Sequence, residues 1–107
     1  MCPVYCASKA ALDALTRTMA IDFGKHKIRV LGFNPAGIQT NMSTASLAPV
    51  YQGDVEKMAA AFIERIPLRE FFIPMDQVVN TILFLASGIA GMMTGSSVVL
   101  DGGFLTT

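Results

Sequence analysis

Cysteine and histidine, the side chains that most often build reactive or metal-binding sites, are scarce in this chain. Its 107 residues include two cysteines and one histidine. Cys2 and Cys6 lack further metal ligands, because His26 lies beyond the helix expected to carry Cys6. Cys6 is either a reactive thiol near a helix N-terminus or a small apolar residue packed under the helix. His26 lies in the polar turn 25–27 as a solvated residue, so we expect no metal site.

Charge and long apolar runs are also scarce. Charged residues make up 15% of the chain, eight basic and eight acidic, against a usual share of about 25%. This balance gives no sign of binding to nucleic acid or to an anionic membrane surface. The chain contains neither an apolar run of membrane-spanning length nor a signal-peptide pattern. We therefore expect a cytoplasmic protein without nucleic-acid or membrane partners, and the low cysteine content fits a reducing compartment.

The nine glycines do not form the G-x-x-x-G-x-G or G-x-G-x-x-G run that opens a dinucleotide-binding fold. Such a run places the pyrophosphate at a helix N-terminus, so these residues alone offer it no cradle. Hydrophobic residues, in contrast, make up 52% of the sequence. We expect much of this apolar surface to be covered by something else.

The first element present is a helix-period stripe of apolar and small side chains. Its members are Ala7, Ala10, Ala11, Ala14, Leu15, Thr18, Met19 and Phe23. Gly24 then predicts a helix end in the left-handed conformation. On the outer face, Asp13 and Arg17 have the spacing of an exposed ion pair.

Tyr5 and Lys9 occupy positions i and i+4 of this helix, so their side chains are neighbours on one face. A neighbouring cation favours the ionised form of a phenol. A phenol in this setting can donate a proton to a carbonyl oxygen or accept one from an alcohol. Two surface residues one turn apart would show the same spacing, so the rest of the chain must distinguish the two interpretations.

The apolar run from Ile28 to Phe33 predicts a strand buried on both faces, as in parallel sheets. Helix, tight turn and buried strand form the second half of a β-α-β unit. Ligands of open α/β sheets bind beyond the carboxyl ends of the strands, which here is the turn-rich segment 34–42. This segment either meets a polar ligand or is an ordinary connection.

The rest of the chain predicts a polar lid, two helices and a strand. Residues 41–51 are turn-prone and suit a mobile lid. Asp54 is a candidate N-cap, and Pro74 suits a first helical position. The nearly continuous apolar run 78–85 predicts a well-buried helix. Residues 97–100 predict the last strand. The apolar side of the helix after Asp54 would be Val55, Met58, Ala59, Phe62 and Ile63.

Taken in order, these motifs resemble the short-chain dehydrogenase/reductase family, most of all its carbonyl and L-xylulose reductase branch. The resemblance runs from Tyr5 to Gly103. It implies an α/β fold, the C-terminal part of a Rossmann-like doubly wound parallel sheet with two strands and about three main helices. The motifs are Tyr5-Cys6-Ala7-Ser8-Lys9, Ile28-Arg29-Val30, Asn34-Pro35 with Thr40, Pro67-Leu68-Arg69, Pro74-Met75-Asp76-Gln77-Val78, Thr94-Gly95-Ser96 and Val99-Leu100-Asp101-Gly102-Gly103.

The resemblance also implies roles for individual residues. Tyr5 would be the general acid/base that meets the substrate oxygen. Lys9 would favour ionisation of that phenol and hydrogen-bond the nicotinamide ribose. Ala36 replaces the glycine that many members carry after the proline, and a positive φ there would strain it. The cofactor-binding residues would be Tyr5, Lys9, Pro35, Gly37, Ile38 and Thr40.

The implied activity is that of an NAD(P)-dependent oxidoreductase, with NADP slightly favoured over NAD. It would reduce a ketone, dicarbonyl or sugar such as L-xylulose, or oxidise the matching alcohol. The family's catalytic Ser and Asn precede the Tyr, so residues 1–107 are expected to be the C-terminal portion of a single domain. The alternative is a non-catalytic short chain that acts only by association. The small-residue face of the first helix matches where the family packs subunits, which predicts a homo-oligomer (dimer or tetramer).

Overall fold

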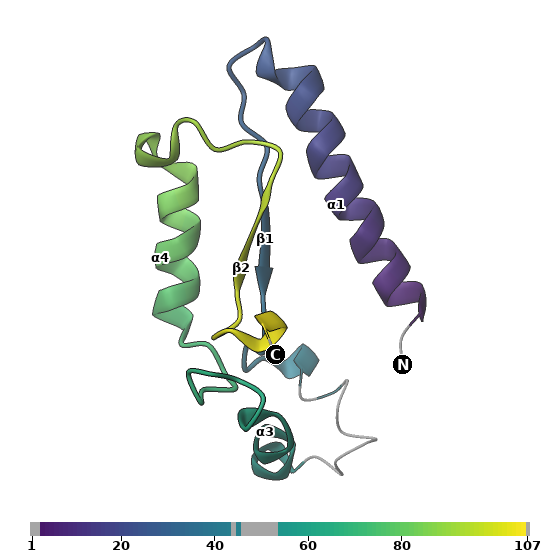
Figure 1. The fold of residues 1–107 in the computed structure, drawn as a ribbon, viewed down its shortest axis with the longest axis vertical. Helices are drawn as coiled ribbons and strands as arrows, with labels where there is room; N and C mark the ends of the chain where they lie inside the picture. Colours follow the sequence, from purple (N-terminus) through teal and green to yellow (C-terminus); the bar gives the residue numbers. More distant parts are fainter. Residues whose placement is uncertain (1–2, 44, 46–53, 107) are drawn as a thin grey trace. The chain divides into compact units, whose positions relative to one another are not determined.

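The computed structural model describes residues 3–43, 45 and 54–106 (Figure 1). These residues contain two strands and three main helices, as the α/β prediction requires. The lid predicted at residues 41–51 lies largely outside the described residues. The elements are α1 (Pro3–Gly24), β1 (Gly32–Pro35), α3 (Val55–Ile63), α4 (Met75–Ala86), β2 (Ser97–Leu100) and the 3₁₀ helices η1 (Gly88–Ala90) and η2 (Phe104–Thr106).

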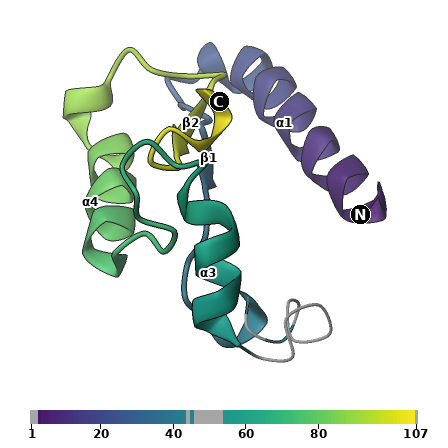
Figure 2. The ribbon, with the colours of Figure 1, turned by 60° about the horizontal axis from the view of Figure 1, so that its bottom comes forward.

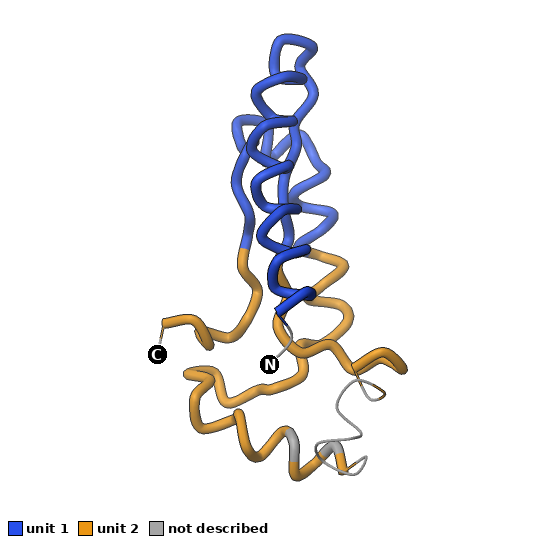
Figure 3. The backbone as a smooth tube through the Cα atoms, turned by 90° about the vertical axis from the view of Figure 1, so that its right-hand side faces the viewer, with its two compact units in different colours: residues 1–33, 81–98 blue, residues 34–80, 99–107 orange. Residues whose placement is uncertain are grey.

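The chain forms two compact units (Figure 3). The first consists of residues 1–33 and 81–98, and the second of residues 34–80 and 99–107. In the first unit, α1 lies on one side of the strands and the last turns of α4 on the other (Figures 1 and 2). The second unit contains α3 and the turn that follows β2.

The strands β1 and β2 pair in parallel, and the pairing begins later than the sequence predicts. The Gly32 amide donates to the Ser96 carbonyl at 2.9 Å, which starts the ladder. Val30 instead bonds the turn before β2, accepting from the Gly95 amide at 2.7 Å. Both strands are half-buried rather than buried on both faces. The reason is that β2 is the one strand paired with β1 in the described part of the chain.

Helix α1 turns a different face to the strands from the one that its apolar stripe predicts. Thr16 and Ala20 are its buried residues, and Asp13 beside them is half-buried. Asp13 is half-buried and accepts a hydrogen bond from Ser97 of β2, so its predicted position on the outer face is wrong. The predicted stripe is largely exposed, with Ala7, Ala10, Ala11, Ala14, Leu15 and Thr18 all in contact with solvent.

The end of α1 also differs from the prediction. Gly24 is the last helical residue and does not have a positive φ. Lys27 takes the left-handed conformation instead, with φ of 62°. The amides of His26 and Lys27 donate to the carbonyls of Phe23 and Gly24, both at 2.9 Å. The chain therefore leaves the helix through one further tight turn before it reverses.

Helix α4 is more exposed than its apolar sequence predicts. Val78 and Leu85 are buried, whereas Leu83 on the opposite side is 62% exposed. An apolar sequence favours burial, but the described residues provide a packing partner for one side of the helix only. Pro74 precedes the helix rather than opening it, and its carbonyl accepts from the amides of Gln77 and Val78.

The second unit is built around Ile66, which is 1% exposed. Asp54 caps α3 as predicted, its Oδ1 atom accepting from the Lys57 amide at 2.9 Å. The half-buried residues of α3 include three from the predicted apolar side: Ala59, Phe62 and Ile63. After β2, Gly102 turns with φ of 62°, and a Cβ there would lie 2.8 Å from Cγ2 of Ile66. The predicted turn therefore closes directly over this core.

Candidate active site

Tyr5 and Lys9 are neighbours on the N-terminal part of α1, as their spacing predicts. The Lys9 Nζ atom lies over the Tyr5 ring, 5.3 Å from its centroid. This distance is within the range of a cation–π contact. Ser8, between them in sequence, donates from its hydroxyl to the Tyr5 carbonyl at 2.7 Å and so stays on the helix backbone.

The phenol of Tyr5 is accessible, because the residue is 62% exposed. An accessible hydroxyl can meet an oxygen atom of a bound molecule, and a neighbouring ammonium provides positive charge for the same molecule. Cys6 on the same helix is also exposed, so the interpretation of it as a packed apolar residue is wrong. Across residues 3–43, 45 and 54–106, no group of three or more His, Cys, Asp or Glu side chains could hold a metal ion.

The predicted cofactor loop leaves the carboxyl end of β1, as expected for a ligand-binding loop. Pro35 is the last residue of β1, and the Ala36 amide donates to the Leu100 carbonyl at 2.9 Å. Lys27 and Arg69 are the non-glycine residues with positive φ in the described ranges. Ala36 is therefore not strained, and its replacement of glycine is compatible with the loop.

Further along the loop, two contacts fix the backbone. Gly37 forms a parallel bridge with Phe72, and its carbonyl accepts from the Ile73 amide at 2.8 Å. Thr40 and Ser43 cap each other. The Thr40 amide donates to Ser43 Oγ at 3.0 Å, and the Ser43 amide donates to Thr40 Oγ1 at 3.2 Å.

Ser43 and Phe72, which hold the backbone of the loop, were not predicted from the sequence. Ser43 has a detectable signal, since two hydroxyl residues spaced as Thr40 and Ser43 resemble a capping box. Phe72 has no local signal, because its bridge partner is distant in sequence. The six predicted site residues thus form two groups. Tyr5 and Lys9 belong to the first unit, and Pro35, Gly37, Ile38 and Thr40 belong to the second.

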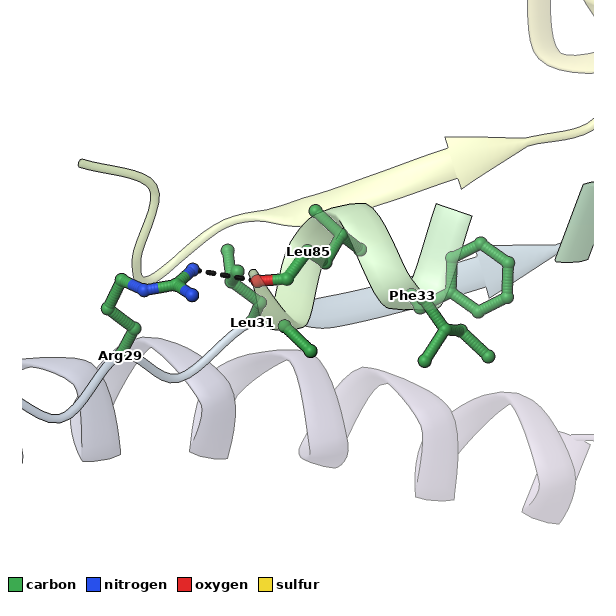
Figure 4. A pocket seen from close by; sticks show the side chains of 6 residues that line it. Arg29, Leu31, Phe33 and Leu85 are labelled. Carbon is green, nitrogen blue, oxygen red and sulfur yellow. Dashed lines mark hydrogen bonds between the residues drawn. The ribbon is translucent and has the colours of Figure 1, made fainter. Parts of the chain in front are cut away.

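Arg29 lines a groove between β1 and α4 that contains none of the predicted site residues (Figure 4). Its Nη1 atom donates to the Leu85 carbonyl at 2.8 Å, and its Nη2 atom donates to the Ser87 carbonyl at 2.9 Å. Arg29 therefore satisfies the carbonyls at the C-terminus of α4, which is a structural role. The lining residues are Arg29, Leu31, Phe33, Ile82, Leu85 and Ala86.

Residues 1–105 match the family model described as enoyl-(acyl carrier protein) reductase. Among curated proteins, the chain is 48% identical over 104 residues to L-xylulose reductase of Bos taurus, covering 97% of this chain and 40% of that protein. It is 47% identical over 104 residues to D-erythrulose reductase of Gallus gallus, covering 97% and 39%. The chain thus spans about two-fifths of the length of these relatives.

Solved structures show the same fold. A short-chain type dehydrogenase/reductase from Mycobacterium marinum is 34% identical with a TM-score of 0.77, covering 96% of this chain and 37% of that one. A 4-hydroxyisoleucine dehydrogenase complexed with NADH is 35% identical with a TM-score of 0.77, covering 96% and 40%. The α/β fold of a Rossmann-like sheet is thereby confirmed for the matched residues. No helix within the described ranges is long and apolar enough to cross a bilayer.

Proposed function

Because the chain belongs to the short-chain dehydrogenase/reductase family, we propose that it contributes the catalytic tyrosine and lysine of an NAD(P)-dependent oxidoreductase. In this proposal residues 1–107 are the C-terminal portion of a single cytoplasmic reductase domain. The observation that supports it most directly is the position of the Lys9 ammonium, 5.3 Å from the centroid of the exposed Tyr5 ring. Such a pair offers a proton donor and a positive charge to one bound molecule.

The hydroxyl, ammonium and backbone groups of the predicted site residues are of the kinds that can hydrogen-bond a nicotinamide cofactor. When bound, the nicotinamide supplies a hydride to a carbonyl carbon or accepts one from an alcohol. Tyr5 donates the accompanying proton to the carbonyl oxygen, or removes it from the alcohol. Lys9 places its ammonium beside the Tyr5 ring and would hydrogen-bond the ribose. The loop would hold the carboxamide through the backbone of Pro35, Gly37 and Ile38 and through the hydroxyl of Thr40.

The relatives support a class of substrate. L-xylulose and D-erythrulose reductases are named for ketoses, and both are more than 45% identical to this chain. We therefore propose a small ketone, dicarbonyl or ketose as the substrate. The NADH complex of 4-hydroxyisoleucine dehydrogenase supports a nicotinamide dinucleotide, and the resemblance slightly favours NADP over NAD.

A second candidate function is association without catalysis. Helix α1 exposes large apolar side chains, among them Leu12 and Leu15, which are 54% and 50% exposed. A contiguous exposed apolar face favours contact with another protein surface. In this alternative the chain acts only through a homo-oligomer, a dimer or a tetramer, and Tyr5 transfers no proton.

A chimera distinguishes the two functions. Residues 1–107 would replace the matched segment of the Bos taurus L-xylulose reductase, and NADPH- or NADH-dependent reduction of L-xylulose would be followed at 340 nm. We expect the chimera to be active. Tyr5→Phe should lower its kcat about 100-fold or more, because the variant keeps the ring but lacks the hydroxyl that donates the proton. Thr18→Val, which removes an exposed hydroxyl further along α1, is the matched control. A folded chimera whose turnover does not depend on Tyr5 would leave association as the better account.

A further inference from the structure

The middle of the proposed cofactor loop is held by residues that follow α3 along the chain. Gly37 is bridged to Phe72, and the Ile73 amide donates to the Gly37 carbonyl at 2.8 Å. A bridge of this kind fixes the backbone of both segments. Residues 38–40 follow directly, so their position depends on the segment 71–73.

Phe71 fills the space against Gly37. A Cβ placed on Gly37 would lie 2.8 Å from the Phe71 carbonyl oxygen and 3.3 Å from Cε1 of its ring. The three nearest atoms to that position all belong to Phe71. Because Phe71 occupies the space where a side chain of Gly37 would lie, a smaller or displaced side chain at position 71 would loosen the packing against Gly37.

The same ring is packed on α3. Phe62 of α3 stacks on Phe71, with ring centroids 5.4 Å apart and an interplanar angle of 21°. Phe104 also contacts Phe62, edge-on at 6.3 Å. Stacked and edge-on pairs at these distances are favourable arrangements of aromatic rings. A continuous line of contacts therefore runs from α3 through Phe62 and Phe71 to Gly37.

We propose that Phe71 is a positioning residue that sets the backbone of residues 37–40 for the nicotinamide. Through its stack on Phe62, the position of α3 is coupled to cofactor affinity. This inference rests on the proposed function, because the role of the loop in cofactor binding is assigned there. Phe71 acts through Gly37, so its removal affects binding of the cofactor and not the proton transfer from Tyr5.

Hydrogen exchange on the chimera in the absence of cofactor tests the contact. In Phe71→Leu the Ile73 amide should exchange about tenfold faster than in the parent chimera, because its acceptor on Gly37 is released. Phe71→Tyr keeps the ring and should exchange at the parent rate. Phe104→Leu is the matched control, since it removes a ring from the same cluster. Equal exchange at Ile73 in Phe71→Leu and Phe104→Leu would overturn the proposed contact.

Kinetics of the chimera test the role in cofactor binding. Phe71→Leu should raise the KM for NADPH about tenfold while kcat and the KM for L-xylulose stay within about twofold, since uniform binding energy is lost. Phe71→Tyr should restore the KM for NADPH, and Phe104→Leu should leave it unchanged. A parent chimera without Tyr5-dependent activity counts against the proposed function. An active chimera in which Phe71→Leu leaves the KM for NADPH unchanged counts against the positioning role alone.

Discussion

The hydroxyl of Ser97 donates a 2.9 Å hydrogen bond to Asp13 Oδ1, which joins the first residue of β2 to the middle of α1. Asp13 is half-buried beside Thr16 and Ala20, the buried residues of the helix. Partial burial of a carboxylate is costly unless a donor satisfies it. The face that α1 turns to the strands is therefore set by a polar contact as well as by packing.

Replacing Ser97 by alanine removes the donor and leaves Asp13 half-buried. We expect Ser97→Ala to lower the free energy of unfolding by about 1.5–3 kcal/mol, as for other hydrogen bonds to charged groups. Urea unfolding followed by circular dichroism at fixed protein concentration measures this change. Ser96→Ala is the control, because Ser96 bonds Gly32 through its backbone carbonyl. If both variants lose the same stability, the bond to Asp13 contributes nothing specific.

Gly32 is the position on β1 where a side chain would meet this bond. A methyl group at Gly32 would overlap the Ser97 hydroxyl. Gly32→Ala should therefore destabilise the chain by about 1–3 kcal/mol, the usual cost of overpacking. In the double variant with Ser97→Gly the overlap is gone, so the two losses should be less than additive. Strict additivity in urea unfolding would show that the methyl group is accommodated elsewhere.

Local signals predicted the parts of the fold that depend on neighbours in sequence. The cap at Asp54 and the contact of Tyr5 with Lys9 follow from spacings of a single helical turn. The buried face of α1 does not, because it depends on packing and on a hydrogen bond from Ser97, far along the chain. The sequence likewise predicted an apolar α4 but could not show that its outward side lacks a neighbour among the described residues.

The candidate site follows the same rule. The family resemblance predicted a cofactor role for the loop from Pro35 to Thr40, and helical spacing predicted that Tyr5 and Lys9 are neighbours. The bridge from Gly37 to Phe72 has no signal within the loop, because it pairs segments separated by α3. Roles inherited from a family resemblance name the residues that touch a ligand. The residues that hold them in place become visible only in the packed chain.

The Arg29 guanidinium bridges the carbonyls of Leu85 and Ser87 at the end of α4. Arg29→Met leaves both without this donor, and we expect a loss of about 2–4 kcal/mol in the free energy of unfolding. Arg29→Lys should recover part of this lost stability, because a single ammonium group cannot reproduce both hydrogen bonds of the planar guanidinium. Arg17→Met on the exposed face of α1 should change stability by less than about 0.5 kcal/mol. Equal unfolding midpoints for Arg29→Lys and the parent would show that the two-donor geometry of the guanidinium does not contribute to stability.

Lys27 follows α1 with φ of 62°. This left-handed conformation is unfavourable for a residue that has a Cβ atom. Lys27→Gly should therefore raise the free energy of unfolding by up to about 1 kcal/mol, since glycine adopts this φ without strain. Lys25→Gly in the same turn has no strain to relieve, so it should be neutral or destabilising. Thermal unfolding of the two variants side by side measures the difference. A lower midpoint for Lys27→Gly than for Lys25→Gly would contradict the prediction.

The 107-residue chain alone should neither bind nicotinamide dinucleotides measurably nor behave as a stable monomer. In the proposed function, Tyr5, Lys9 and the loop residues would contact only the nicotinamide end of the cofactor. The sequence contains no Gly-rich run for the pyrophosphate. In the described residues β1 pairs with β2 alone, and a sheet of two strands is marginally stable. The free edge of β1 and apolar side chains such as Leu83 favour association.

Calorimetric titration with NADPH and NADH measures binding of the cofactor, and sedimentation velocity at low concentration measures the state of association. Micromolar binding, or a monomer that unfolds cooperatively, would show that these residues are sufficient on their own.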